Sequence, residues 1–253
     1  NYTCRGADYA LLVTQVRADH VTVAGVPAER VCVIPNGIRP ERFTDPPSRL
    51  NAKARLGIQE SFVLGFAGFV RDWHGLERVV DFLASNSAQN LHFLVVGDGP
   101  ACEALRARAA GAGVEHLVTI TGVVDRTKVT EYLAAFDIAL QPAVVAYASP
   151  LKLFEYLTLG HAIVAPKTAN IMEILVDEQN ALLFDVESAE AFGACIARLI
   201  GDDDLRRRLG EEARNTIDRQ GFTWPHNAAR VERLYAEGLS AKDSDAKATA
   251  ENE

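Results

Sequence analysis

The sequence predicts an α/β fold built on a doubly wound parallel sheet of the Rossmann-like type. Short apolar runs alternate with helical patterns through most of the 253 residues, which is the order of strands joined by crossover helices. The runs are apolar at successive positions, as in strands that are covered on both faces. In such sheets, ligands bind at the carboxyl ends of the strands, where the strand order reverses.

Two short strands with a helix between them come first. Residues 10–14 form an apolar run, residues 16–25 have a helical pattern, and residues 31–37 form a strand that Pro-Asn-Gly ends. A polar stretch with three prolines follows at residues 39–58 and predicts a linker.

One complete doubly wound domain is predicted over residues 62–200. Its first strand is 62–68, and its first helix, 75–85, has an apolar stripe at helical spacing. Further strands are predicted at 91–97, 117–122, 137–142, 162–166 and 181–184, and further helices at 102–110, 128–136, 150–159, 171–176, 188–200, 203–220 and 224–238. Residues 240–253 are small, polar and charged without apolar periodicity, which predicts a disordered tail.

The composition limits the class of partner. A net charge of −8 argues against a nucleic-acid partner, although a local site on an acidic protein can still bind an anion. The longest apolar runs are too short to span a membrane, and we find no signal peptide. The chain lacks an initiator Met and begins inside a structured unit, so we expect a fragment.

The cysteines are expected to be free thiols in a reducing compartment. Cys4, Cys32, Cys102 and Cys195 are far apart and show neither a CxxC motif nor the spacing of a metal site. A localisation in the cytoplasm follows, either free or peripheral at the inner face of the membrane.

The sequence SPLKLFEYLTLG at residues 149–160 carries the main candidate site. Ser149 is expected to cap a helix that has Pro150 in its first turn, and the free amides of that turn favour an anion. Lys152 in the first turn opposes the helix dipole by about 0.3–1 kcal/mol unless an anion lies in front of it. Glu155 shares the Lys152 face. Two interpretations stay open, a phosphate and sugar site or a local i,i+3 ion pair.

A second candidate segment, GFVRDWHG, lies between the first strand of the domain and its first helix. Gly68 would let a ligand approach the backbone, and Arg71 and His74 would donate to it, unless this is only a solvated loop. Glu173 is expected to cap the short helix over 171–176 rather than to reach the cleft. A GxGxxG motif after the first strand and a GK[ST] motif are both absent, which argues against a dinucleotide fingerprint and a P-loop.

The ordered motifs from residue 7 to residue 239 resemble those of the family-4 retaining glycosyltransferases, which have the GT-B fold. The motifs are IPNGI (34–38), GFAGF (65–69), LVVGDGP (94–100), ITG (120–122), FDIAL (136–140), SPLKLFEYLTLG (149–160) and NALLF (180–184). The resemblance implies two Rossmann-like domains with a cleft between them, of which this chain supplies the C-terminal, donor-binding one. Residues 1–40 would be a remnant of the N-terminal domain with the hinge, and residues 41–239 the nucleotide-sugar domain.

The resemblance also implies roles for single residues. Glu155 would hold the ribose, the backbone around Leu151 and Lys152 would meet the diphosphate, and the main chain near Val123 and Val124 would contact the base. Ser149 and Pro150 would also bind the donor. Gly68 would belong to the same donor site. Lys152, Arg71 and His74 would stabilise the leaving diphosphate, so that neither a metal nor a cofactor is expected.

The expected partners are a nucleoside diphosphate sugar, an acceptor and the missing N-terminal domain. The acceptor would be a glycan, a lipid-linked sugar or a small molecule. The sequence departs from the commonest family pattern at three positions, where Phe69 replaces Arg, His74 replaces Lys and Tyr147 replaces Glu. A nucleotide-sugar 2-epimerase and a non-catalytic nucleotide-sugar-binding module remain as alternatives.

Overall fold

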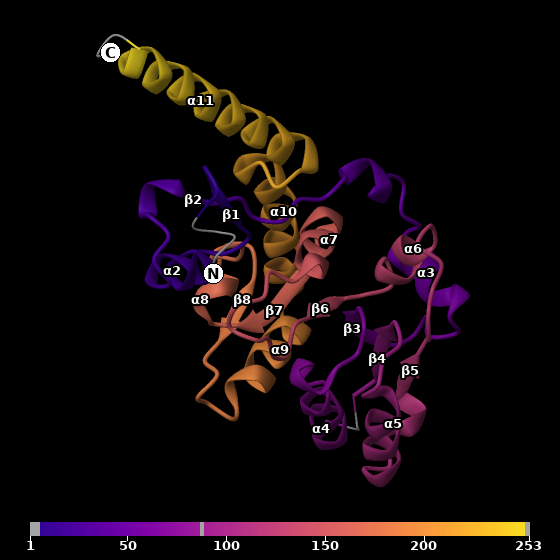
Figure 1. Cartoon of the computed structure of the whole chain (residues 1–253). Helices are drawn as coiled ribbons and strands as arrows, with labels where there is room; N and C mark the ends of the chain where they lie inside the picture. The colour runs from indigo at the N-terminus through magenta and orange to yellow at the C-terminus, as the bar shows by residue number, and fades with distance from the viewer. Residues whose placement is uncertain (1–5, 87–88, 251–253) are drawn as a thin grey trace.

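A six-stranded parallel sheet forms the centre of the chain in the computed structural model, which describes residues 6–86 and 89–250 (Figure 1). The strand order is β5-β4-β3-β6-β7-β8, so the order reverses between β3 and β6. The strands are β3 (Phe62–Ala67), β4 (Leu91–Val96), β5 (Val118–Ile120), β6 (Ile138–Leu140), β7 (Ala162–Pro166) and β8 (Leu182–Phe184). The predicted doubly wound, Rossmann-like α/β fold is confirmed.

Helices cover both faces of this sheet, because alternate residues of each strand bury side chains on opposite sides. Leu64 and Phe66 of β3 pack on the side of α4 (Glu77–Ser85), α5 (Cys102–Gly111) and α9 (Ala191–Gly201). Val63 and Ala67 pack on the other side, with α6 (Val129–Leu133), α7 (Leu151–Leu159) and the second half of α10 (Asp203–Gln220).

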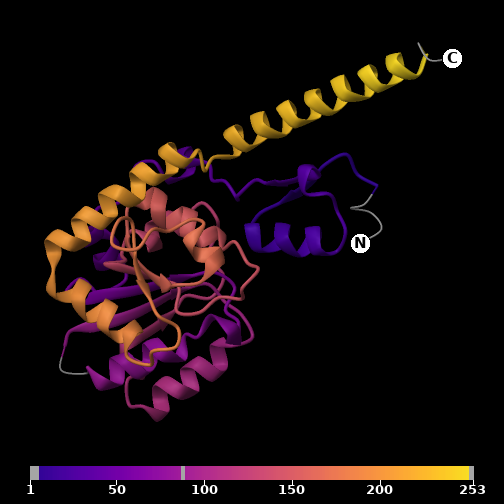
Figure 2. The ribbon, with the colours of Figure 1, turned by 90° about the vertical axis from the view of Figure 1, so that its left-hand side faces the viewer.

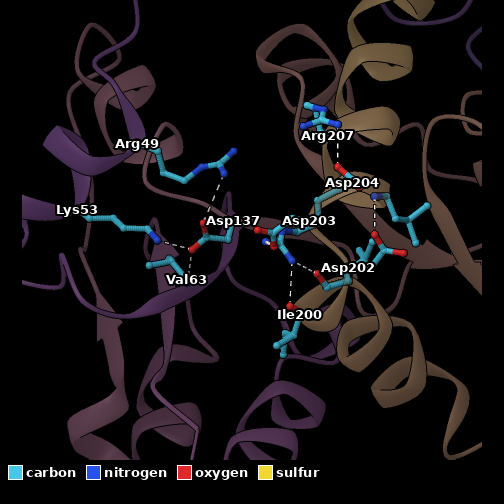
Figure 3. Close-up of polar contacts among 12 residues, drawn as sticks. Arg49, Lys53, Val63, Asp137, Ile200, Asp202, Asp203, Asp204 and Arg207 are labelled. Carbon is cyan, nitrogen blue, oxygen red and sulfur yellow. Dashed lines mark hydrogen bonds and ion pairs between the residues drawn. The ribbon is translucent and has the colours of Figure 1, made fainter.

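The prediction of a linker over residues 39–58 is wrong for its second half, which is a helix that packs on the sheet. Helix α3 (Arg49–Arg55) follows a short 3-10 turn, η2 (Pro40–Phe43). The buried Lys53 ammonium donates to Asp137 Oδ2 at 2.5 Å and to Ser61 O at 2.9 Å. Figure 3 shows this pair together with Arg49, which lies 3.5 Å from Asp137 Oδ1. The prolines that precede α3 concealed its helical pattern in the sequence.

The first predicted unit forms a sheet of its own. Strands β1 (Ala10–Leu12) and β2 (Val31–Val33) pair in parallel, and α2 (Gln15–Val23) connects them. Figure 2 shows this unit beside the larger domain, beneath the start of the last helix. A short 3-10 turn, η1 (Ala28–Arg30), leads into β2.

Residues 34–38 after β2, which lie in the predicted hinge, are hydrogen-bonded to the beginning of that last helix. Ile38 N donates to Phe222 O at 3.0 Å, and Trp224 N donates to Ile38 O at 3.1 Å. A Cβ atom at Gly37 would lie 2.7 Å from the Thr223 carbonyl carbon, so only glycine permits this approach.

The prediction of a disordered tail over residues 240–253 is also corrected. Helix α11 (Trp224–Ala250) continues to Ala250 and projects beyond the domain (Figure 1). Ala and Lys are good helix formers, and no Pro or Gly interrupts residues 240–250. Residues 251–253 lie outside the described residues. The short helix expected over 171–176 is α8 (Ala169–Met172).

The remaining sequence expectations concern thiols and membrane spans. Cys32, Cys102 and Cys195 are free, as predicted, whereas Cys4 lies outside the described residues. Over residues 6–86 and 89–250, the helices lack the combination of length and apolar composition that crossing a bilayer requires. Two further 3-10 turns, η3 (Asp72–His74) and η4 (Glu115–Leu117), complete the elements.

Candidate functional site

A hollow of about 610 Å³ opens at the carboxyl ends of β3 and β4, beside the first turn of α7. This is the edge of the sheet where the strand order reverses, and where doubly wound folds bind ligands. Six residues predicted from the sequence line it together: Gly68, Val124, Ser149, Leu151, Lys152 and Glu155. We call this hollow the α7 pocket.

The first turn of α7 presents unpartnered polar groups to the α7 pocket. The helix begins one residue later than predicted, with Pro150 at the N-cap, so the expected cap by Ser149 is wrong. The Ser149 hydroxyl is buried without a hydrogen-bond partner among the described residues. The amides of Leu151 and Lys152 point out of the helix end, as first-turn amides do. A buried orphan hydroxyl beside free amides indicates a missing acceptor, such as an anionic oxygen.

Lys152 has no counter-ion in direct contact among the described residues. Its Nζ lies 3.6 Å from the centre of the Phe66 ring, a cation–π contact. In the described part of the chain, the Lys152 ammonium makes no hydrogen bond and no ion pair. The local i,i+3 ion pair with Glu155 is therefore not formed. Burial lowers the pKa of Lys152 to about 7, although Glu155 opposes this shift.

Gly68 brings the end of β3 against this lysine. Its φ of +133° suits only glycine, and a Cβ atom there would lie 3.2 Å from Lys152 Cε. The backbone immediately before it is fixed, because Ala67 N donates to the buried Tyr156 hydroxyl at 2.8 Å. A side chain at position 68 would therefore both strain the backbone and displace the Lys152 ammonium.

Glu155 connects the α7 pocket to a second hollow of about 450 Å³. Burial raises the pKa of Glu155, while Lys152, Arg126 and Arg42 lower it. Arg42 and Arg126 line the second hollow with Arg39, Glu155 and Trp224. No sequence signal marks these arginines, because Arg42 belongs to the predicted linker and Arg126 to a loop without a motif.

Arg71 and His74 do not line the α7 pocket, and Arg71 instead lines a separate hollow of about 310 Å³ beside α4 and α5. The Arg71 guanidinium stacks over the Phe69 ring at 4.6 Å and over the exposed Trp73 ring at 5.3 Å. His74 Nδ1 accepts from Arg71 N at 3.1 Å, so its Nε2 carries the proton in the neutral ring. Burial, Lys152 and Arg71 lower the pKa of His74 to about 4, which leaves it neutral at pH 7.

Glu173 has a structural role, but it caps α2 and not the short helix that was expected. Both of its carboxylate oxygens accept from Gln15 N, at 2.9 and 2.8 Å, and so cap the start of α2 rather than the short α8. Tyr147 is half-exposed beneath Arg17, whose guanidinium lies 5.0 Å from the ring centre.

Residues 48–216 match the model of a protein family described as glycosyl transferases group 1. The chain belongs to this family. The match spans more than half of the chain and contains α7 with all the residues of the α7 pocket. The GT-B type of domain predicted from the sequence is thereby supported.

Two relatives that are named as glycosyltransferases agree with this assignment. A D-inositol 3-phosphate glycosyltransferase of Xylanimonas cellulosilytica is 28% identical over 234 residues, covering 88% of this chain and 55% of the relative. An uncharacterized glycosyltransferase of Methanocaldococcus jannaschii is 24% identical over 232 residues, covering 90% and 58%.

The crystal structure of Anabaena HepE in complex with UDP has the same fold. It superposes with a TM-score of 0.82 at 21% identity, over 92% of this chain and 65% of that one. The chain thus spans between half and two thirds of the length of these proteins.

Proposed function

We propose that this chain is the donor-binding part of a family-4 retaining glycosyltransferase, which moves a sugar from a nucleoside diphosphate to an acceptor hydroxyl. The observation that carries the proposal is the first turn of α7, where an unpaired ammonium, a buried orphan hydroxyl and free amides surround one hollow. Residues 41–239 form the donor domain in this proposal. Residues 1–40 are the end of an N-terminal domain with its hinge.

The donor is assigned along the α7 pocket. The diphosphate lies against Ser149, Leu151 and Lys152, the ribose against Glu155, and the base beside the main chain at Val124. The relative Anabaena HepE has been crystallised with UDP and with UDP-glucose, which supports a donor of this class.

Electrostatic stabilisation of the leaving group is the proposed source of catalysis. The bond between the anomeric carbon and the diphosphate oxygen breaks, and the acceptor oxygen bonds to that carbon on the same face. The acceptor proton passes to the leaving phosphate, so that no protein base is assigned. Lys152 and the α7 amides neutralise the charge that develops on the diphosphate. In this proposal Arg71 adds a cation from outside the α7 pocket, and neutral His74 adds a hydrogen-bond donor.

A thermal-shift screen with UDP-, GDP- and ADP-sugars tests donor binding, because a ligand that binds only the folded state raises the melting temperature. We expect one of the three to do so. Product analysis with the whole protein then separates transfer from epimerisation. The absence of any shift would contradict the donor site, and a shift without turnover would identify a binding module.

Replacing Glu155 with alanine should weaken binding of the nucleoside part of the donor. The loss of a charged hydrogen-bond acceptor for the ribose hydroxyls predicts about 1–3 kcal/mol. Calorimetry with the nucleoside alone measures it, and Glu155→Gln, which keeps one acceptor oxygen, should lose less. An unchanged nucleoside affinity for Glu155→Ala would remove the ribose assignment.

Nucleoside diphosphate affinity should fall as the pH rises above about 7. Lys152 is protonated below its pKa of about 7, and the diphosphate favours the ammonium, so binding at higher pH must take up a proton. Each pH unit above 7 should then cost up to about tenfold in affinity. His74 does not reverse this trend, because its pKa of about 4 leaves it neutral throughout that range.

Calorimetry between pH 6.5 and 9, in buffers with different ionisation enthalpies, measures both affinity and proton uptake. Lys152→Arg is the control, since a guanidinium stays charged and should give a flat profile. The free energy of unfolding of the free chain should instead increase as the pH rises. The unfolded lysine binds its proton up to about pH 10.5, so unfolding becomes less favourable between pH 7 and that value. A flat affinity profile for the unmodified chain would contradict the prediction.

A further inference from the structure

The loop that leads into α7 is held by side chains rather than by secondary structure. Residues 141–150 contain neither helix nor strand. The buried Asn170 amide of α8 donates to two of the loop's carbonyls, Val145 O at 3.2 Å and Ala148 O at 2.7 Å. Thr168 donates in turn to Asn170 Oδ1 at 2.8 Å, which fixes the direction of the amide.

Two further carbonyls of the same loop are bound from outside the six-stranded domain. Asn36 Nδ2, on the hinge, donates to Ser149 O at 3.0 Å. Arg17 Nε, on α2, donates to Tyr147 O at 3.1 Å. Four of the five carbonyls from 145 to 149 therefore have a side-chain donor, and the one nearest to α7 is bound by the hinge.

The hinge can hold Asn36 in place because its neighbours on both sides are fastened. Pro35 O accepts from Asn227 Nδ2 of α11 at 2.7 Å, and Ile38 exchanges main-chain hydrogen bonds with residues 222 and 224. The Asn36 amide is consequently a donor at a fixed position relative to the start of α11.

The Ser149 carbonyl matters because of the groups on either side of it. The orphan hydroxyl belongs to the same residue, and the free amides of Leu151 and Lys152 follow after Pro150, which has no N–H of its own. Fixing this carbonyl sets the direction in which the first turn of α7 presents its donors. Preorganised donors bind an anion better than mobile ones, since less conformational freedom is lost on binding.

We infer that Asn36 is a positioning residue for the diphosphate, through which the placement of the hinge and the N-terminal segment controls the anion-binding end of α7. This inference rests on the proposed function. Asn36 itself has no place in the lining of the α7 pocket. Its effect passes through Ser149 O, and Arg17 adds a second, exposed connection from the same segment.

The test compares UDP with uridine, GDP with guanosine and ADP with adenosine by calorimetry on the whole chain. Asn36→Ala should weaken diphosphate binding by roughly three- to tenfold, the loss typical of one neutral hydrogen bond, and change nucleoside binding by less than about twofold. Asn90→Ala is the matched control, because it removes the same kind of hydrogen bond, from a side-chain amide to the Glu60 carbonyl at 2.6 Å, away from both the hinge and the loop. It should leave the ratio of the two affinities unchanged.

An equal loss for nucleotide and nucleoside, or the same ratio in Asn36→Ala and Asn90→Ala, would overturn the inference while leaving the donor site intact. Thermal melting of each variant checks the fold. Should Asn36→Ala fail to fold, Arg17→Ala tests the same coupling at an exposed position and should lower the same ratio. An unmodified chain that binds no nucleoside diphosphate would instead overturn the proposed function, and the inference with it.

Discussion

Replacing Asp137 with alanine is expected to lower the free energy of unfolding by about 3–5 kcal/mol, the cost of leaving one partner of a buried ion pair alone. The Asp137 carboxylate accepts from Lys53 Nζ at 2.5 Å and from Val63 N at 2.6 Å. Only 11% and 8% of the Lys53 and Asp137 side chains are exposed, so water cannot replace the lost partner. Chemical denaturation measures the change.

An exposed ion pair between α3 and α6 provides the control. Arg55 and Glu131 lie 2.8 Å apart with 60% and 45% of their side chains exposed, so Glu131→Ala should cost no more than about 1 kcal/mol. The double variant Lys53→Met with Asp137→Leu should recover much of the loss, because an apolar pair avoids the desolvation of both charges. A loss below 1 kcal/mol for Asp137→Ala would show that the pair does not hold α3 to the sheet.

This pair also explains why the sequence misled at residues 39–58. The local signals there are the prolines at 40, 46 and 47, which favour a linker. Helix α3 is stabilised by a partner 84 positions away in the sequence, and no local pattern predicts such a contact. Helix α10, in contrast, begins and ends where predicted, because Asp202 caps its start and Gly221 adopts a φ of +64° at its end.

The part of the candidate site that lies on one continuous segment could be predicted from the sequence. Ser149, Leu151, Lys152 and Glu155 belong to a single motif, and helical spacing alone places them on adjacent turns. Arg42, Arg126 and Asn36 come from separate segments that only the tertiary fold brings to Glu155 and Ser149. The sequence also misplaced the cap by one residue, because Pro150 takes an extended conformation and leaves the Ser149 hydroxyl outside the helix.

Replacing Lys152 with methionine should produce the largest loss of binding, about 2–5 kcal/mol for a nucleoside diphosphate. Methionine keeps an apolar stem of similar length over Phe66 but removes the only ammonium in the α7 pocket as the described residues define it. The nucleoside alone should bind nearly as before, since it carries no phosphate. Calorimetry with UDP and uridine, or with the corresponding pair for another base, gives the two affinities.

The stability of the same variant separates a binding role from a structural one. The Lys152 ammonium has no hydrogen bond or ion pair in the described chain, and its burial opposes the charged form, as the lowered pKa indicates. Lys152→Met should therefore melt at the same temperature as the unmodified chain or higher, while losing the diphosphate. A residue retained for the fold would behave in the opposite way. Equal losses for nucleoside and nucleoside diphosphate, or a lowered melting temperature with unchanged affinity, would argue against a phosphate contact at Lys152.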